Sequence, residues 1–461
     1  MLHLVIDLLS TNLGVQQEAV VLLFALIQSY LISLFYSLFL RNLEIFNRTR
    51  LRSYYFLITG LLLVYWAYGL DLIHSFVNCS VCFLSLKYLH SRTALIANFI
   101  FVLVYLLCGY KANQIDWNYS LTWTMPQCIL TLRLIALSFD LNDKPKSKSF
   151  VAKDFGHIDS SLRHLPNFID FLSFCYFPGA FFVGPLFPYI SYEKFLKSNK
   201  FDSNKIRISL HRIFGSFLIT AIYLIGSKFW PVDYLLSDEF KQSSLFFKLT
   251  SIAIVSKIYM YKYILSWLIA ESACMVSGLA HNDFGVYLNV NYIQFETARS
   301  FTAIIKSYNI TTNNFAFRFI YRRLKFLGNI YLSQLITLAF LSIWHGFESG
   351  YHMAFSIEFL ILYFEKNLTR IIEQKNLWKN FSFRYSDWIL CVAGKLYTFY
   401  FIGYGFLPFM LLYYELWMPI FKSIYFIVHL LLGLYILCSL VFSSQIFSSK
   451  KISYVNNAEK S

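Results

Sequence analysis

Long apolar segments, separated by short polar and basic ones, follow one another along most of the chain. The first clear one covers residues 19–40 (AVVLLFALIQSYLISLFYSLFL), and the next cover residues 54–70, 72–90 and 94–110. Each is close to the roughly 17–25 predominantly apolar residues that an α-helix needs to cross a bilayer. The apolar runs are continuous, whereas a membrane β-barrel would show short alternating segments. The pattern predicts an all-α, polytopic integral membrane protein.

Further candidate segments follow, and about eleven of all the candidates are expected to be spanning helices. Residues 168–190 contain the sequence PGAFFVGP, whose prolines and glycines predict a broken helix at membrane depth. Residues 245–280 are long, and we expect them to form two helices. The remaining candidate segments lie at residues 121–139, 213–230, 330–346, 351–365, 387–403, 404–419 and 422–444.

The stretch from Asn289 to Lys325 contains no spanning run. It is amphipathic, so we expect it to lie along the membrane face. The sequence shows neither an internal repeat nor a soluble domain, and residues 1–447 are predicted to form a single transmembrane domain. Residues 448–461 are polar and are predicted to be a disordered tail.

Composition supports the membrane prediction and limits the partners. Of the 461 residues, 57% are hydrophobic and only 14% are charged, whereas a soluble chain carries about a quarter charged residues. The net charge of +15 arises mainly in short loops between apolar segments, and this distribution is typical of the basic residues that set membrane topology. A membrane surface and anionic ligands therefore explain the charge better than a nucleic acid does.

His345 stands at the end of an apolar run, between Trp344 and Gly346. In a dry membrane cavity desolvation disfavours the imidazolium, so the ring would be neutral and able to accept a proton as a general base. A histidine at a helix end that meets interfacial water explains the position equally well. The position alone leaves both interpretations open.

Asn309 begins an Asn-Ile-Thr sequence, which is an acceptor pattern for N-glycosylation. The basic residues around it favour a cytosolic face, where no glycosylation would occur. A second interpretation is an amide that hydrogen-bonds a substrate carbonyl or orients a hydroxyl.

Four basic residues follow within a short segment: Arg318, Arg322, Arg323 and Lys325. They are explained either as a solvated or snorkelling face or as a site for the phosphates of a nucleotide-like acyl carrier. Inside the expected spans, Arg133 and Glu271 should satisfy each other or the backbone rather than react. Cys79 and Cys82 form an isolated CxxC motif, which is a weak metal or redox signal.

Six stretches, taken together and in order, resemble the membrane-bound O-acyltransferase family, in its lysophospholipid acyltransferase branch and closest to the lysophosphatidylcholine type. They are WTMPQCILTLRLIALSFD at 123–140, FPGAFFVGP at 177–185, ESACMVSGLAHN at 271–282, SYNITTN at 307–313, RRLKFLGN at 322–329 with LSQ at 332–334, and WHGFESGYHMAF at 344–355. They cover the middle half of the chain.

This resemblance implies helices around an intramembrane reaction chamber and an acyl-CoA-dependent lysophospholipid acyltransferase of the endoplasmic reticulum membrane. It assigns the catalytic histidine to His345 and the motif asparagine to Asn309. His345 would take the hydroxyl proton, Asn309 would hold the carbonyl or the hydroxyl, and the basic segment around Arg318 to Lys325 would receive the CoA phosphates. Because a thioester is already activated, neither a metal nor a tightly bound cofactor is expected.

Three other functions stay open. A sterol or diacylglycerol acyltransferase of the same family would share the His and the Asn, and a protein acyltransferase would modify a lumenal peptide. A transporter would use Arg133, Glu271 and His345 as an intramembrane relay. The sequence does not determine the preferred head group, the preferred acyl chain or a retention signal for the endoplasmic reticulum. It does not determine the oligomeric state either, so a homodimer also stays open.

Overall fold

The computed structural model describes residues 2–113, 122–143, 160–198, 202–279, 287–374 and 386–439. Within these residues the named elements are helical, and the β-structure is one isolated antiparallel bridge between Val290 and Tyr308. The all-α prediction is therefore confirmed. The expected tail 448–461 and the last residues of the 271–282 stretch lie outside the described residues.

The chain folds into two compact units. The first consists of Met1–Phe229, Ile258–Glu296 and Ile305–Phe347, and it contains both Asn309 and His345. The second consists of Trp230–Lys257, Thr297–Ile304 and Glu348–Ser461.

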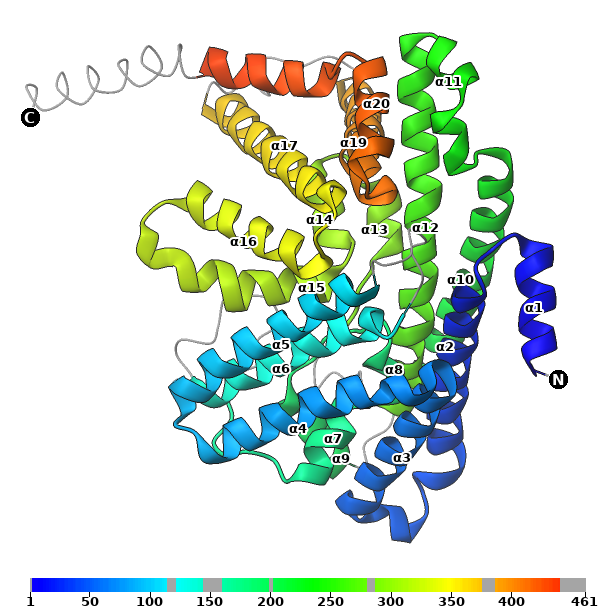
Figure 1. The fold of residues 1–461 in the computed structure, drawn as a ribbon, viewed down its shortest axis with the longest axis vertical. Coiled ribbons are helices and arrows are strands. Elements are labelled where there is room, and N and C mark those ends of the chain that lie inside the picture. The colour runs from blue at the N-terminus through cyan, green and yellow to red at the C-terminus, as the bar shows by residue number, and fades with distance from the viewer. Residues whose placement is uncertain are drawn as a thin grey trace, which may run out of the picture. The chain divides into compact units, whose positions relative to one another are not determined.

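The N-terminal part of the first unit is a run of long helices, drawn from blue to cyan in Figure 1. They are α1 (Leu2–Leu13), α2 (Gln17–Phe35), α3 (Thr49–Tyr68), α4 (Leu72–Tyr88), α5 (Ser91–Asn113) and α6 (Thr124–Asn142), with the short helical turns η1 (Tyr36–Leu40), η2 (Glu44–Asn47) and η3 (Gly69–Asp71) between some of them. Helices α4, α5 and α6 pack side by side (Figure 1).

Residues 168–190 form a broken helix, as their prolines and glycines predict. The pieces are α7 (Phe168–Cys175), α8 (Pro178–Phe181) and α9 (Tyr189–Lys197), and the long α10 (Asn204–Phe229) follows. Gly60 of α3 faces the end of α7, where an added Cβ would lie 1.9 Å from the carbonyl oxygen of Tyr176. Only a glycine lets the two helices approach this closely.

Three buried arginines satisfy the carbonyl ends of helices in the first unit. Arg133 donates to two carbonyls at the end of α7, Arg52 to two at the end of α9, and Arg41 to one at the end of α12 (Leu245–Ser277). A helix C-terminus carries unpaired carbonyls and the negative end of the helix dipole, so a guanidinium there is stabilising. The expectation that Arg133 satisfies the backbone is confirmed.

Helix α12 is one continuous helix of 33 residues, so the expectation of two helices in residues 245–280 was wrong. Residues 245–277 contain neither a glycine nor a proline that would break the helix, and Gly278 directly follows its end. Its mid-span cation does not interrupt it either, because Nζ of Lys262 lies 3.5 Å from the centre of the Tyr259 ring.

The second unit is built around α17 (Ser349–Gln374) and α19 (Ser386–Leu411), which pack against each other. It also contains η5 (Val232–Leu236), α11 (Asp238–Gln242), α20 (Tyr414–Ser423) and the first residues of α14 (Phe301–Ser307). We expected one span to end at residue 403 and another to begin there, but α19 continues to Leu411. Gly403 is a packing position rather than a break, since an added Cβ would lie 2.5 Å from the Ala253 Cα.

Seven helical segments in the described residues are long and apolar enough to cross a membrane. They are Gln17–Leu40, Thr49–Tyr88, Ser91–Asn113, Thr124–Asn142, Asn204–Leu236, Leu245–Ser277 and Trp388–Leu411. A helix pair bent by 73°, Tyr414–Ser423 with Ile427–Ser439, raises the number to eight if it is one span. The protein therefore crosses the membrane several times.

Candidate active site

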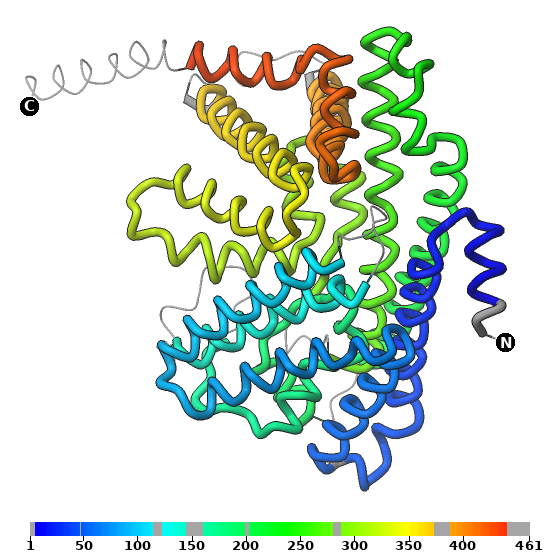
Figure 2. Tube along the Cα trace, in the orientation of Figure 1, coloured from blue at the N-terminus to red at the C-terminus, as the bar shows by residue number. Residues whose placement is uncertain are grey.

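Asn309 and His345 belong to one helical hairpin of the first unit. After Asn309 the chain passes through α15 (Ile310–Phe315), η6 (Ala316–Ile320) and η7 (Tyr321–Leu327), turns, and returns as α16 (Ile330–His345). Figure 2 shows this reversal in the yellow-green part of the trace. Gly328 makes the turn with a φ of 64°, a conformation that suits glycine.

Two contacts fix the antiparallel register of the hairpin. Near the turn, the Ser333 hydroxyl donates to the Leu324 carbonyl at 3.1 Å. Farther from the turn, the rings of Phe315 and Phe340 lie 6.3 Å apart between their centres. Asn309 lies roughly one and a half helical turns before Phe315. His345 lies about the same distance after Phe340. The two predicted catalytic residues therefore lie at the same end of the hairpin, away from its turn.

The end of α16 is anchored against α5 and α6. Trp344 donates its indole N–H to the Cys128 carbonyl at 3.0 Å, and its own carbonyl accepts from the Tyr110 hydroxyl at 3.3 Å. The His345 ring lies 4.4 Å from the Trp344 ring, between their centres. Gly346, at a φ of 139°, ends the helix directly after the histidine. His345 is therefore the last residue of α16, and the hydrogen bonds of its neighbour Trp344 fix the end of the helix from which the imidazole projects.

Asn309 has an uncommon backbone conformation. Its φ of 50° and ψ of 42° are left-handed, which asparagine adopts more readily than most residues. It directly precedes α15, yet within the described residues its amide forms no capping bond to that helix. The side-chain amide is therefore not needed to cap α15.

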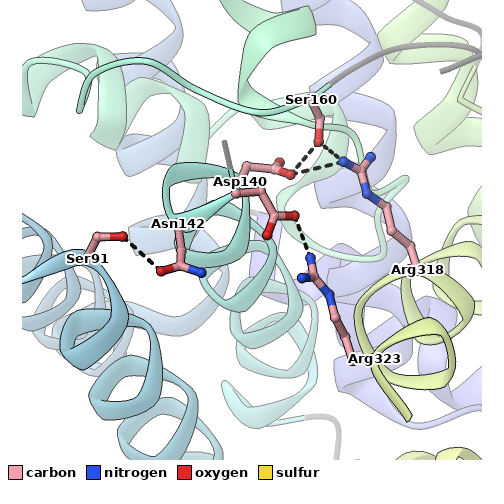
Figure 3. Close-up of polar contacts among 7 residues, drawn as sticks. Ser91, Asp140, Asn142, Ser160, Arg318 and Arg323 are labelled. Atoms are coloured by element: carbon pink, nitrogen blue, oxygen red, sulfur yellow. Dashed lines mark hydrogen bonds and ion pairs between the residues drawn. The ribbon is translucent and has the colours of Figure 1, made fainter. Parts of the chain in front are cut away.

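The four predicted phosphate-binding residues lie on η6 and η7, and two of them hold carboxylates at the end of α6. Arg318 donates to Asp140 at 3.3 Å and to the Ser160 hydroxyl, which itself donates to Asp140 (Figure 3). Arg323 pairs with Asp143. These contacts tie the hairpin to α6.

The exposure of these side chains leaves room for a further ligand. Asp140 is buried, whereas the side chains of Arg318 and Arg323 remain 37% and 40% exposed. Arg322 is half-buried, and Lys325 is exposed. The sequence analysis did not identify the two aspartates, although Asp140 is the last residue of the 123–140 stretch and Asp143 lies three residues farther on.

Arg133 and Glu271 do not satisfy each other. Arg133 binds backbone carbonyls, as described above, and Glu271 forms a buried ion pair with Arg212 of α10. The transporter hypothesis combined Arg133, Glu271 and His345 in one relay. Instead, the structure provides the first two with separate partners.

A family model described as MBOAT, membrane-bound O-acyltransferase family, matches residues 106–407 of this chain. The chain belongs to the membrane-bound O-acyltransferase family. The matched region includes Asn309, the basic segment and His345. The resemblance inferred from the six sequence stretches is thereby confirmed.

Several relatives carry the name of one branch of this family. The chain is 33% identical over 443 residues to Lysophospholipid acyltransferase 5 of Homo sapiens, covering 93% of this chain and 90% of the relative. It is 29% identical over 441 residues to Lysophospholipid acyltransferase 5 of Drosophila melanogaster, covering 91% and 86%. The Lysophospholipid acyltransferase of Schizosaccharomyces pombe is 25% identical over 376 residues, covering 76% and 72%.

Proposed function

We propose that this membrane-bound O-acyltransferase moves a long-chain acyl group from acyl-CoA to the free hydroxyl of lysophosphatidylcholine and of other lysophospholipids. The observation that carries the proposal is the 33% identity over 93% of the chain to a relative named Lysophospholipid acyltransferase 5. The match extends over nearly the whole of both chains, so it includes the spans as well as the motifs.

In the proposed reaction His345 is the general base. It takes the proton of the lysophospholipid hydroxyl as that oxygen attacks the thioester carbonyl carbon. The carbon–sulfur bond then breaks, and His345 returns the proton to the departing thiolate. Asn309 holds the carbonyl oxygen or the attacking hydroxyl in line. The shared end of the hairpin supports this pairing of roles.

The basic segment is proposed to receive the CoA phosphates from the cytosolic side. Arg318 and Arg323 already bind carboxylates, but a guanidinium carries five N–H donors, so each can contact a phosphate as well. Arg322 and Lys325 complete the proposed set. The acyl chain belongs in the membrane interior, because each methylene kept from water is worth about 0.8 kcal/mol.

We propose that residues 1–447 act as one acyltransferase domain in the endoplasmic reticulum membrane. No metal is part of the proposed mechanism, since the thioester is activated without one. Acyl-CoA is the proposed co-substrate, and a lysophospholipid is the proposed acceptor. A homodimer is the proposed assembly.

The test uses microsomes that express the wild type, His345→Ala or Asn309→Ala at matched levels. Labelled acyl-CoA is offered with lysophosphatidylcholine, lysophosphatidylserine, lysophosphatidylethanolamine, cholesterol or diacylglycerol. We expect labelled diacyl phospholipid from the wild type and its loss in both variants. Label in a neutral ester or in a protein would reassign the acceptor, and no labelled product at all would remove the acyltransferase proposal.

A further inference from the structure

We infer that Glu271 is a positioning residue for Asn309, acting through a short two-stranded contact between residues 289–291 and 307–310. The inference rests on the proposed function, because it assumes that Asn309 acts on the substrate. Glu271 and the PGAFFVGP loop were two conspicuous sequence features without a role in the reaction. Both belong to the structure that holds Asn309.

The first link runs from Glu271 to the backbone of residues 289 and 290. Glu271 lies on α12 and is 0% exposed. Its Oε1 accepts the N–H groups of Asn289 and Val290, at 2.5 and 3.0 Å, and its Oε2 pairs with Arg212. A carboxylate makes stronger hydrogen bonds to backbone N–H than a neutral acceptor does. The buried charge is compensated by Arg212, so the carboxylate is a firm anchor for this segment.

The second link runs from that segment to both sides of Asn309. Asn291 donates its N–H to the Ser307 carbonyl at 2.9 Å, and Ile310 donates to the Asn289 carbonyl at 2.8 Å. The isolated β-bridge between Val290 and Tyr308 lies between these bonds. Residues 307 and 310 are therefore tied to the segment held by Glu271, and Asn309 is enclosed between them.

The aromatic ring next to Asn309 is fixed as well. The Tyr308 ring packs against Trp267 of α12 and Phe295 of α13 (Tyr292–Thr297), at 4.8 and 5.3 Å between ring centres. The helix that carries Glu271 thus also contacts the Asn309 segment directly, through Trp267. A left-handed residue persists where its surroundings determine its conformation from several sides.

The third link brings in the PGAFFVGP loop through side chains. The Thr311 hydroxyl donates to Oδ1 of Asn289 and accepts the N–H of Leu186 at 3.1 Å. The Asn289 amide nitrogen donates to the Val183 carbonyl at 3.2 Å. An added Cβ on Gly184 would lie 3.0 Å from that amide nitrogen. Gly184, the second of the two glycines in this loop, is explained by its φ of 84° and by this close approach of Asn289.

Catalysis is sensitive to such positioning, since a misplacement of about 1 Å can cost roughly 10²-fold in rate. The test compares purified Glu271→Ala and Thr311→Val with the wild type, in the same lipid environment and per folded protein. We expect kcat to fall about 10- to 100-fold, while KM for acyl-CoA and for the lysophospholipid changes by less than about twofold. Thr311→Ser keeps the hydroxyl and should retain most of the kcat that Thr311→Val loses.

Arg52→Gln is the matched control, because it removes another buried charge that holds backbone groups, at the end of α9. It should reduce the folded yield and leave kcat per folded protein unchanged. The inference would be overturned if Glu271→Ala or Thr311→Val reduced only the folded yield, as this control does. It would also be overturned if either variant raised KM while kcat stayed constant. Thr311→Val decides the question if Glu271→Ala does not fold.

The two proposals fail in distinguishable ways. If Asn309→Ala keeps the wild-type kcat, the assumed role of Asn309 is removed, and the positioning role goes with it. If Asn309→Ala is impaired and Thr311→Val is not, the proposed function stands and only the inference about Glu271 is lost.

Discussion

Phe315 stacks on Phe340 across the hairpin that carries both predicted catalytic residues, with 6.3 Å between ring centres and an angle of 28° between ring planes. Both side chains are buried. Phe340 also contacts Phe99 of α5 at 5.9 Å. This pair therefore sets the register of the hairpin and joins it to the helices at its side.

The first prediction concerns this pair. Phe315→Leu and Phe340→Leu should each lower the midpoint of thermal unfolding in detergent, and a double-mutant cycle should give a coupling of about 0.5–1.5 kcal/mol. The coupling is expected because an aromatic pair adds to the effect of simple burial. Additive effects of the two changes would contradict the assigned contact.

The second prediction concerns the end of α16. His345→Ala should lower kcat by at least about 10²-fold, the usual contribution of a general base. Trp344→Phe removes the indole donor to the Cys128 carbonyl and keeps an aromatic ring, so it should lower kcat less. The rates are to be measured per folded protein with labelled acyl-CoA, and a wild-type rate for His345→Ala would exclude the base.

The third prediction tests the ion pair by which Arg323 of the basic segment contacts Asp143 at the end of α6. Arg323→Asp should weaken the contact to α6, and the double change Arg323→Asp with Asp143→Arg should restore thermal stability, by about 0.2–1 kcal/mol for such a partly exposed pair. The double variant keeps the net charge, so it also controls for long-range electrostatics. No recovery in the double variant would count against the pair.

The fourth prediction concerns Lys325, which is exposed. Lys325→Glu should raise the KM for acyl-CoA several-fold and leave the KM for the lysophospholipid unchanged, because only the CoA head carries several phosphates. The effect should shrink as salt is added, since exposed charges are screened over about 8–10 Å at moderate ionic strength. An equal rise in both KM values, or no dependence on salt, would exclude a direct electrostatic role.

The fifth prediction concerns the second unit. Gly350→Ala should lower the folded yield and the unfolding temperature, because the added Cβ would lie 2.1 Å from the Pro408 carbonyl oxygen, and such overpacking costs about 1–3 kcal/mol or more. Gly433→Ala is the matched control, with nothing within 4 Å of the added Cβ. It should be neutral or mildly stabilising, since alanine is the better helix former. Equal behaviour of the two variants would contradict the tight contact.

The sequence by itself determined the fold class, the broken helix near PGAFFVGP and the family. Apolar runs long enough for a bilayer are a local property, because each helix satisfies its own backbone hydrogen bonds within one segment. Proline and glycine also interrupt a helix at their own positions, so the broken helix is a local property as well. The family was readable because its motifs, from 123–140 to 344–355, keep their order along the chain.

Only the tertiary structure decided which polar groups meet. Glu271 pairs with Arg212 rather than Arg133, and Asp140 binds Arg318. These partners are far apart in sequence, and many arginines and carboxylates would satisfy the same local pattern. A buried charge has to be compensated wherever it lies, but the packing of the helices selects its partner. For the same reason the link from Glu271 to the Asn309 segment could not be predicted from periodicity alone.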